Sequence, residues 1–393
     1  MKSNLLIPFA IGHCANDFVP IGMYLLIPAF GTAMGLSPTE IGLLFMIHSL
    51  GASVAYFPAG MLADHVANRG ILLALTFFWC GLGYLSSSFA DSFWVFAALI
   101  AIGGMGDAAW HPIATGVLAQ MHKARRAYAL GMHAVGGHLS EVIALPAVGF
   151  LLAMADWRLA IQVMIVPTFL MGIVFLFIAP HVPRHVNSRP TVADFADIWK
   201  VWTNGAGLKV IALFTTYNMS LFAIIAMMPL YLKDAHSFGW QETSLVMAVM
   251  MLFGALGQPW AGKISDQIGR KPICLTGNAL VCLAAFVAWA SPSLIVSVLG
   301  LGVALIVGVA IRAVLLAAAV DHAGGREGTS LGLTFAFMDG FAATAALLAG
   351  LAGETGLANA FLLASLFSLI ATGFALVMPR RQPGLVAGEA LAP

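Results

Sequence analysis

Five ionisable side chains lie where the sequence is otherwise almost uncharged, and they are the first sign of chemistry. Asp17, Asp107, Glu141, Arg312 and Asp339 each fall near the middle of an apolar run. One such charge costs about 2.5 to 3.5 kcal/mol at the centre of a membrane-spanning helix. Five unrelieved charges would cost roughly 12 to 18 kcal/mol, whereas a typical protein folds with only about 5 to 15 kcal/mol. We therefore expect these side chains to face a wet cavity, to pair with one another, or to take up protons.

Histidines accompany the acids of the first half. The pairs are His13 with Asp17, Asp107 with His111, and His138 with Glu141. Residues three or four apart share one helix face, so each run presents an imidazole beside a carboxylate. Burial disfavours the carboxylate and a neighbouring imidazolium favours it, so such a pair can exchange a proton near neutral pH. We predict proton coupling at Asp17, Asp107, His111, His138 and Glu141.

Arg312 has two interpretations. It can be an internal counter-ion for Asp339 or Glu141, or it can contact an anionic substrate, since a fixed guanidinium suits a carboxylate or phosphonate. We assign substrate binding to His13, Asn16, Arg312 and Asp339. For the other membrane histidines, His48 and His133, we favour a structural hydrogen bond to a neighbouring helix.

Composition indicates what surrounds these residues. Hydrophobic residues make up 61% of the 393 and charged residues 9%, against about 25% charged in soluble proteins. The chain divides into about twelve apolar runs near the ~20 residues that span a bilayer. They are 5–30, 39–63, 70–89, 92–119, 127–153, 157–179, 207–232, 241–265, 271–290, 293–320, 328–352 and 357–379. We predict an all-α membrane protein of twelve transmembrane helices, with the lipid bilayer as a partner and no nucleic acid.

Two loop segments repeat each other at an offset of 202 residues: Gly60 and Asp64 correspond to Gly262 and Asp266. Basic residues follow each of them, at Arg69, Arg270 and Lys271. We interpret these seven residues as gates, in which glycine lets helices approach closely and aspartate pairs with helix ends. Asp64→Asn should then change the balance between inward-open and outward-open states. Loop capping without a role in switching is the alternative.

The repeat predicts two pseudo-symmetric six-helix bundles, residues 1–179 and 207–381, joined by a cytoplasmic linker, 180–206. Within the linker, Val192, Phe195, Trp199 and Trp202 recur at helical spacing, which predicts an amphipathic helix on the inner leaflet, with an irregular connector as the alternative. Residues 382–393 are expected to be a disordered tail. We interpret residues 1–30 as a retained first helix and not as a signal peptide, because polar residues interrupt the run.

The distribution of lysine and arginine predicts the orientation. If both termini are cytoplasmic, the outer loops hold only Arg158 and Lys233. We therefore expect a multi-pass protein of the bacterial inner membrane, and a monomer. The four cysteines lie within predicted spans and show neither disulfide nor metal-type spacing, so we expect no metal and no other cofactor.

Several motifs resemble a known transporter family. GKISDQIGRKPI (262–273) is similar to the loop signature of the major facilitator superfamily. GHCANDF (12–18), GMGDAAWHP (104–112) and AVGGHLSEVIALP (134–146) resemble the fosmidomycin-resistance type of efflux protein. The chain departs from that type at Ile113, where a glutamate is usual, at His138, where an asparagine is usual, and at Glu141. The resemblance implies a central cavity between two six-helix halves and proton-driven export of a small molecule.

We predict a proton-coupled secondary transporter, most simply an antiporter that exports a small organic compound or drug, with anions among the candidates. Proton-coupled import of an organic acid or a metal chelate is the same-fold alternative. A membrane sensor or enzyme is more remote, because no soluble signalling domain and no nucleophile with a base in motif context are apparent. The chain is therefore not expected to be an enzyme.

Overall fold

The computed structural model describes residues 5–122, 125–184, 200, 202–323, 336 and 339–378. The side chains at positions 64, 65, 126, 127, 320 and 323 are outside the described part. The side chain of Asp64, the predicted linker helix before position 200 and the predicted tail therefore lie outside the described residues.

The described chain is almost entirely helical. The first half contains α1 (Leu6–Asn16), α2 (Phe18–Met34), α3 (Pro38–His65), α4 (Arg69–Ser87), α5 (Phe93–Met121), α6 (Arg126–Met154), α7 (Trp157–Met164), α8 (Val166–Ile178) and a short 3-10 turn, η2 (Ala179–His181). The second half contains α10 (Gly205–His236), α11 (Trp240–Ile268), α12 (Arg270–Ala290), α13 (Leu294–Ala323), α15 (Thr344–Gly353) and α16 (Asn359–Leu376). Within the described residues, eleven helical spans are long and apolar enough to cross a membrane, and a shorter apolar helix covers 339–353. The prediction of an all-α membrane fold is confirmed.

The first predicted span is interrupted. The sequence predicts one helix over residues 5–30, but α1 ends and α2 begins at Asp17. Pro20 has no backbone N–H, so the carbonyl of Asn16 loses its intrahelical donor. The Cys80 thiol, 4.0 Å away, donates to that carbonyl, and the Thr168 hydroxyl donates to the carbonyl of Ala15 at 2.7 Å. Side chains of two other helices therefore stabilise the break at which Asp17 lies.

The residues between α2 and α3 determine where the first of these helices ends and the second begins. α2 ends at Gly35, whose left-handed backbone (φ 67°) terminates the helix. Ser37 then caps α3 in a capping box with Glu40, and Pro38 occupies the first turn, where its missing N–H costs nothing. The turn between the first two spans is thus short and well defined.

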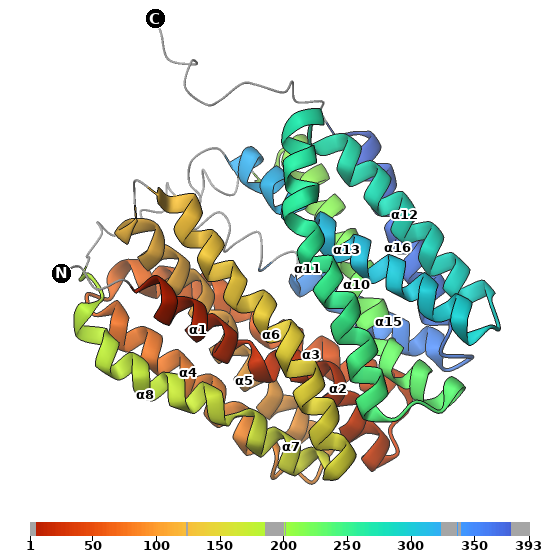
Figure 1. Ribbon diagram of the computed structural model, residues 1–393, viewed down its shortest axis with the longest axis horizontal. Helices are drawn as coiled ribbons and strands as arrows, with labels where there is room; N and C mark the ends of the chain where they lie inside the picture. Colours follow the sequence, from red (N-terminus) through yellow and green to blue (C-terminus); the bar gives the residue numbers. More distant parts are fainter. Residues whose placement is uncertain are drawn as a thin grey trace, which may run out of the picture.

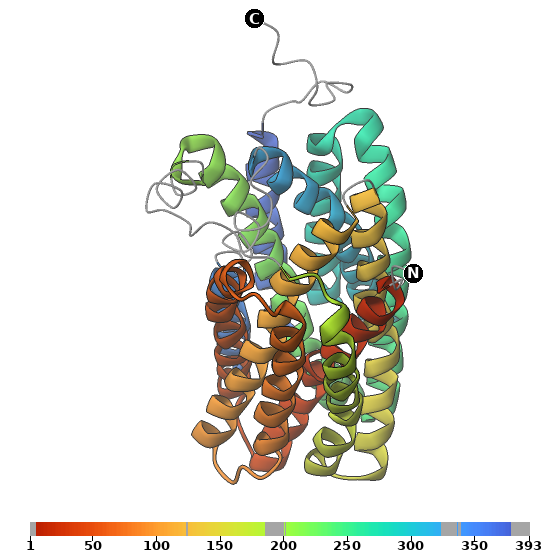
Figure 2. The same ribbon diagram turned by 90° about the vertical axis from the view of Figure 1, so that its left-hand side faces the viewer.

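The two halves lie side by side, and their helices run roughly parallel (Figures 1 and 2). We call the end that holds Gly35, Asp91, Arg158 and Asp234 the turn end, and the end that holds Arg69, Arg184 and Arg270 the linker end. The halves touch through α3 with α15 and through α6 with α11. These contacts place the two halves directly against each other.

Glycines allow the close approach at the turn end. A Cβ at Gly42 or at Gly350 would clash with backbone atoms of the other half, at Ala346 and Pro38 respectively. A Cβ at Gly149 would clash with Ser244 of the other half. The absence of a side chain at these positions lets the backbones pack, so the turn end is closed.

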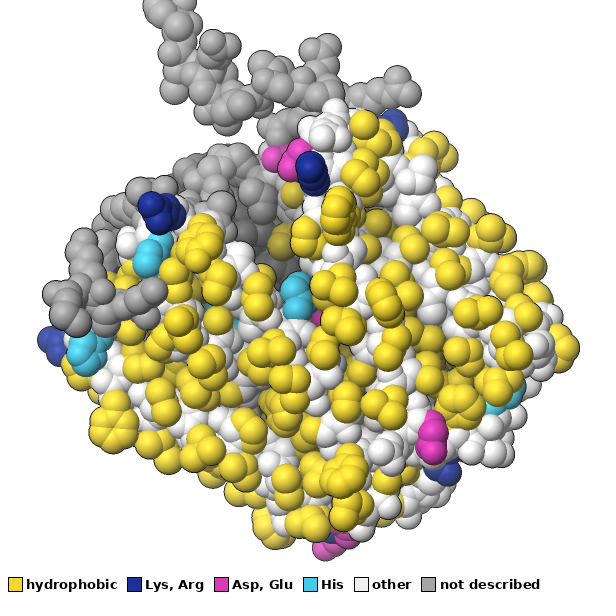
Figure 3. Space-filling view, in the orientation of Figure 1, with side chains coloured by type: hydrophobic (Ala, Val, Ile, Leu, Met, Phe, Trp, Pro, Cys, Tyr) yellow, Lys and Arg dark blue, Asp and Glu magenta, His cyan; other side chains and the backbone are white. Residues whose placement is uncertain are grey.

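The linker end is different, and the predicted gating role of its glycines stays a prediction. Among the described residues, a Cβ at Gly262 would meet nothing within 4 Å, and one at Gly60 would only reach Pro112 at 3.8 Å, an ordinary contact. These glycines therefore do not mark close helix contacts, because the halves diverge toward this end. Figure 3 shows the resulting groove between the halves, with a histidine and an acidic side chain inside it.

The outer surface is apolar. Phe177, Met154 and Trp260 expose 76%, 71% and 69% of their area, and hydrophobic side chains cover most of the face in Figure 3. On that face the charged side chains lie near the two ends and in the groove. This is the surface expected of a protein that sits in a bilayer.

Candidate functional site

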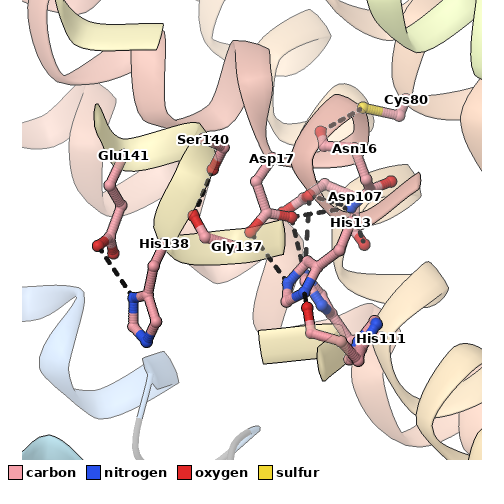
Figure 4. A network of polar contacts seen from close by, with 11 residues as sticks. His13, Asn16, Asp17, Cys80, Asp107, His111, Gly137, His138, Ser140 and Glu141 are labelled. Atoms are coloured by element: carbon pink, nitrogen blue, oxygen red, sulfur yellow. Dashed lines mark hydrogen bonds and ion pairs between the residues drawn. The ribbon is translucent and has the colours of Figure 1, made fainter. Parts of the chain in front are cut away.

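A cluster of imidazole and carboxylate groups lies at the break between α1 and α2. His13 Nε2 is 3.2 Å from Asp17 Oδ2, and His111 Nε2 on α5 is 3.6 Å from Asp17 Oδ1 and 3.8 Å from Asp107 Oδ1. The predicted pairs at four-residue spacing are therefore real contacts. The structure also brings the two pairs together around Asp17 (Figure 4). We call His13, Asp17, Asp107 and His111 the first-half cluster.

Asn16 holds the acids of this cluster. Its side-chain amide donates to Asp107 Oδ1 at 2.5 Å, to the Asp107 carbonyl at 3.2 Å and to Asp17 Oδ1 at 3.3 Å. Asn16 is fully buried. These contacts join α1 to α5, and the substrate-binding role expected of Asn16 stays a prediction.

Aromatic rings enclose His13. The ring of His13 stacks on that of His133 at 4.1 Å between centroids, and the His133 ring stacks in turn on Trp110 at 5.1 Å. His13 Nδ1 hydrogen-bonds to the backbone carbonyl of His133 at 2.7 Å. His133 therefore supports His13 structurally. His48 contacts Tyr84 on α4 through a 2.7 Å hydrogen bond, the helix-to-helix role expected for it.

The third predicted pair lies apart from the cluster. His138 Nδ1 and Glu141 Oε2, both on α6, are 3.4 Å from each other, and the exposed fractions of their side chains are 34% and 14%. Figure 4 shows this pair beyond Ser140 and Gly137, separate from the side chains around Asp17. The five residues predicted to couple protons thus form two groups.

Arg312 lies in the second half with its side chain exposed, although it occupies the middle of the apolar helix α13. Glu141 and Asp339 act electrostatically on it, as do the hydroxyls of Tyr217 and Tyr24. Glu141 and Tyr24 belong to the opposite half, so the guanidinium faces the space between the halves and not lipid. Among the described residues, no carboxylate lies within the 4.0 Å ion-pair distance of Arg312.

Asp339 is held by both halves. Asn218 on α10 donates to its Oδ1 at 3.2 Å, and the Tyr56 hydroxyl on α3 hydrogen-bonds to the same side chain. Sequence analysis missed Asn218 and the tyrosines. The repeat contained a signal for Asn218, which lies 202 residues after Asn16. No pattern marked the tyrosines, because an aromatic residue in an apolar helix is usually a packing residue.

The predicted gate residues lie at the linker end, and the two copies differ. Arg69 is buried and donates to Gln120 Oε1 at 2.8 Å. Arg270 pairs with Asp266, donates to Ser265 Oγ at 2.6 Å and lies 3.6 Å from Asp321 Oδ2 on α13. The ammonium group of Lys271 donates to the carbonyl of Leu376. In the second copy the basic residues thus tie α12 to its neighbours.

Glu354 makes polar contacts between the halves at the closed turn end. The backbone N–H of Thr39, in the first turn of α3, donates to Glu354 Oε1 at 3.1 Å. Hydrogen bonds from the side chain and the backbone of Thr39 lower the pKa of the Glu354 carboxyl below its ordinary value. The helix N-terminus adds to this preference for the charged form.

The ligand chemistry of the first-half cluster is that of a cation site. One donor atom each from His13, Asp17 and His111 lies within 4.8 Å of the others. The surroundings of Arg312 have the opposite character, with a guanidinium and hydroxyl groups that suit an anion. The molecule therefore carries two chemically distinct sites near the middle of its helices.

Comparison with known proteins places the chain among transporters. It is 26% identical over 268 residues to the probable sulfoacetate transporter of Cupriavidus necator, a match that covers 64% of this chain and 61% of that protein. It is 26% identical over 277 residues to the probable L-galactonate transporter of Escherichia coli, covering 64% of this chain and 60% of that protein. The matches thus span about 60% of the length of these relatives.

A solved structure has the same fold. The bacterial homolog of the human lysosomal transporter Spinster, crystallised in an inward-facing and unoccupied conformation, superposes with a TM-score of 0.81 at 15% identity. The superposition covers 98% of this chain and 99% of that one. At this identity the likeness establishes the fold alone.

The family model itself matches nearly the whole chain. It aligns with residues 9–266 and again with residues 235–392. The relatives named above are transporters, and the expectation that this chain is not an enzyme agrees with them. The narrower resemblance to the fosmidomycin-resistance type stays a prediction. The twelve-span pattern, the repeated loop and the family match together show that the chain belongs to the Major Facilitator Superfamily.

Proposed function

We propose that this protein moves a small organic anion across the membrane by proton-coupled alternating access. The observation that carries the proposal is Arg312, an exposed guanidinium at mid-helix, facing the other half and without an ion pair among the described residues. A charge at that depth costs about 2.5 to 3.5 kcal/mol unless it is relieved. A bound carboxylate or sulfonate would relieve it with charge-assisted hydrogen bonds.

The relatives support this class of substrate. Their names refer to sulfoacetate and L-galactonate, which are both small organic anions. Tyr24, which lies within electrostatic range of Arg312, offers its hydroxyl group to a polyhydroxylated or sulfonated ligand, whereas the hydroxyl of the buried Tyr217 donates to the carbonyl of Gly308 at 2.6 Å. A hydroxylated acid therefore suits the site better than an apolar drug.

Charge balance favours symport over antiport for such a substrate. Glu141 and Asp339 both act on Arg312, so the site carries more negative than positive charge when both acids are ionised. Protonation of either acid would free the guanidinium for the anion, so the proton and the anion help each other to bind. Antiport requires the two to compete, which suits a cationic or neutral substrate better. In this scheme Glu141, with His138 beside it, carries the coupling proton.

The conformation is consistent with alternating access. The turn end is closed by glycine contacts and the Thr39–Glu354 hydrogen bond, and the groove opens toward the linker end. With the predicted cytoplasmic termini in a bacterial inner membrane, this is an inward-open state. Asp64, Arg69, Asp266, Arg270 and Lys271 lie where the linker end must close, which fits their predicted gating role.

The test uses purified protein in liposomes with an imposed pH gradient and radiolabelled sulfoacetate or L-galactonate. Symport predicts accumulation when the outside is acidic, whereas antiport predicts accumulation when the inside is acidic, whichever way the protein is inserted. Arg312→Ala should abolish uptake, and Lys209→Ala, which removes an exposed charge from the first turns of α10, should retain it. Equal uptake by both variants would refute the anion site. Accumulation only with acid inside would instead support the predicted exporter.

A further inference from the structure

We propose that the first-half cluster is a binding site for a divalent transition-metal cation of the Zn²⁺ type, with His13, Asp17 and His111 as ligands. Zinc binds imidazole nitrogen and carboxylate oxygen at about 2.0 to 2.2 Å, which places neighbouring ligand atoms about 3.3 to 3.6 Å apart in a tetrahedron. The observed separations are 3.2 Å between His13 Nε2 and Asp17 Oδ2 and 3.6 Å between His111 Nε2 and Asp17 Oδ1, so each imidazole approaches a different oxygen of Asp17. One donor atom from each of the three residues lies within 4.8 Å of the others, so small side-chain movements would complete the ligand set.

The second contact of His13 is that of a metal-binding imidazole. Its Nδ1 lies 2.7 Å from the backbone carbonyl of His133. A carbonyl only accepts, so Nδ1 carries the hydrogen, and Nε2 of the neutral ring then presents a lone pair toward Asp17. Metal-ligating histidines usually have this arrangement, in which a carbonyl or carboxylate fixes the tautomer. Two acceptors 3.2 Å apart need a cation or an additional proton between them.

The charge of the cluster also favours a divalent ion. When both are ionised, Asp17 and Asp107 carry two negative charges, and Asp107 Oδ1 lies 3.8 Å from His111 Nε2, near enough for a fourth ligand after a small shift. The amide of Asn16 donates to both acids but supplies no positive charge. One divalent cation would neutralise both carboxylates at once, whereas protons alone would have to bind twice.

The surrounding helices hold the ligands in place. A Cβ at Gly137 would come within 2.8 Å of the His13 imidazole, so α6 packs directly against it. Trp110 is fully buried beside His133. A metal ion here would tie α1 to α5 within the first half. The site shares no ligand with the surroundings of Arg312, although Arg312 acts electrostatically on His111, so metal binding can be measured apart from anion transport.

Two measurements on the full-length protein at pH 7.5 test the proposal. After treatment with EDTA, Zn²⁺ should raise the Tm of the wild type by about 3 °C or more, and Co²⁺ should give the visible absorption of a four-coordinate site. Asp17→Asn and His111→Gln should abolish both signals. His48→Gln, which removes a histidine bonded to Tyr84 outside the cluster, should retain them.

A variant that keeps a metal ligand at position 111 shows whether the lost signals result from misfolding. His111→Cys replaces one ligand with another, so it should still bind Co²⁺ and should add a thiolate charge-transfer band in the near ultraviolet. Signals of equal size in Asp17→Asn and the wild type would overturn the proposal and assign the metal to another surface. No signal in the wild type would show that the cluster binds protons only. Anion uptake measured in EDTA tests the proposed function independently.

Discussion

The two halves share one contact that the duplication has preserved. Asn16 and Asn218 lie 202 residues apart, at equivalent points of the first helix in each half. The amide of Asn16 donates to Asp107 at 2.5 Å, and that of Asn218 donates to Asp339 at 3.2 Å. In each half, then, a buried asparagine holds a carboxylate from another helix. The duplication has thus preserved an asparagine that holds one carboxylate in place.

The chemistry around that contact is not duplicated. The residues 202 positions after His13, Asp17, Asp107 and His111 are Thr215, Met219, Val309 and Ala313. The second half therefore has no counterpart of the first-half cluster at these positions. Conversely, the residue 202 positions before Arg312 is Trp110. The helical fold is therefore repeated, but its chemistry is not. The first half holds the side chains that can bind a cation, and the second half holds the positively charged Arg312.

The largest expected effect concerns Glu141, the acid of the other half that acts on Arg312. Glu141→Gln should reduce the accumulation of anion driven by a pH gradient at least tenfold, because a neutral amide cannot carry the proton. Exchange of labelled for unlabelled anion without a gradient should persist. Uptake and exchange in liposomes measure both quantities, with Asp234→Asn at the turn end as control. Equal loss of exchange would show that Glu141 binds substrate directly.

The two asparagines allow a direct comparison of stability. Asn16→Ala removes hydrogen bonds to two carboxylates from a fully buried position and should lower the unfolding free energy by about 1.5 to 3 kcal/mol. Asn218→Ala removes one longer hydrogen bond and should cost about 0.5 to 1.5 kcal/mol. Denaturant unfolding in detergent measures both values. If Asn218→Ala lowered the unfolding free energy more than Asn16→Ala, the hydrogen bonds of Asn16 would not be the more stabilising ones, and the prediction would be wrong.

A smaller effect is expected where the halves touch. Gly42→Ala places a methyl group against the backbone of Ala346 and should shift the population toward states that are open at the turn end. Distances between spin labels at Ser92 and Ser293 should become longer. Gly373→Ala, where a Cβ meets nothing within 4 Å, serves as control. Unchanged distances would mean that the helices absorb the added methyl group without separating.

The smallest effect concerns Glu354. Because hydrogen bonds from Thr39 lower the pKa of Glu354, the charged form is favoured in this closed state. The contact is therefore intact above the ordinary glutamate range, about pH 4.3, and is lost only as the pH falls through the lowered pKa. Glu354→Gln should produce a small opening of the turn end at neutral pH, seen with the same spin labels. Wild-type distances that change already between pH 7 and pH 5 would contradict this assignment.

Much of the cluster could be predicted from the sequence because helix geometry is local. His13 with Asp17 and Asp107 with His111 are contacts within one helical stretch, and the structure has both. His138 and Glu141 are likewise close at 3.4 Å. What spacing could not predict is that the first two pairs meet around Asp17, because that depends on how α1 packs against α5.

By itself the sequence determined the membrane fold, its duplication and most of the helix boundaries, because hydrophobic length and turn residues act over short stretches of chain. Pro20 weakens the helix near Asp17, but the tertiary structure decided how the break is stabilised, because the side chains of Cys80 and Thr168 donate to the carbonyls of Asn16 and Ala15. It also decided that Arg312 lies within electrostatic range of Glu141 in the other half and of Asp339 in its own half. These arrangements join residues on different helices, in cases such as Thr168 with Ala15 more than a hundred positions apart, and only the packing of whole helices brings such residues within reach of one another.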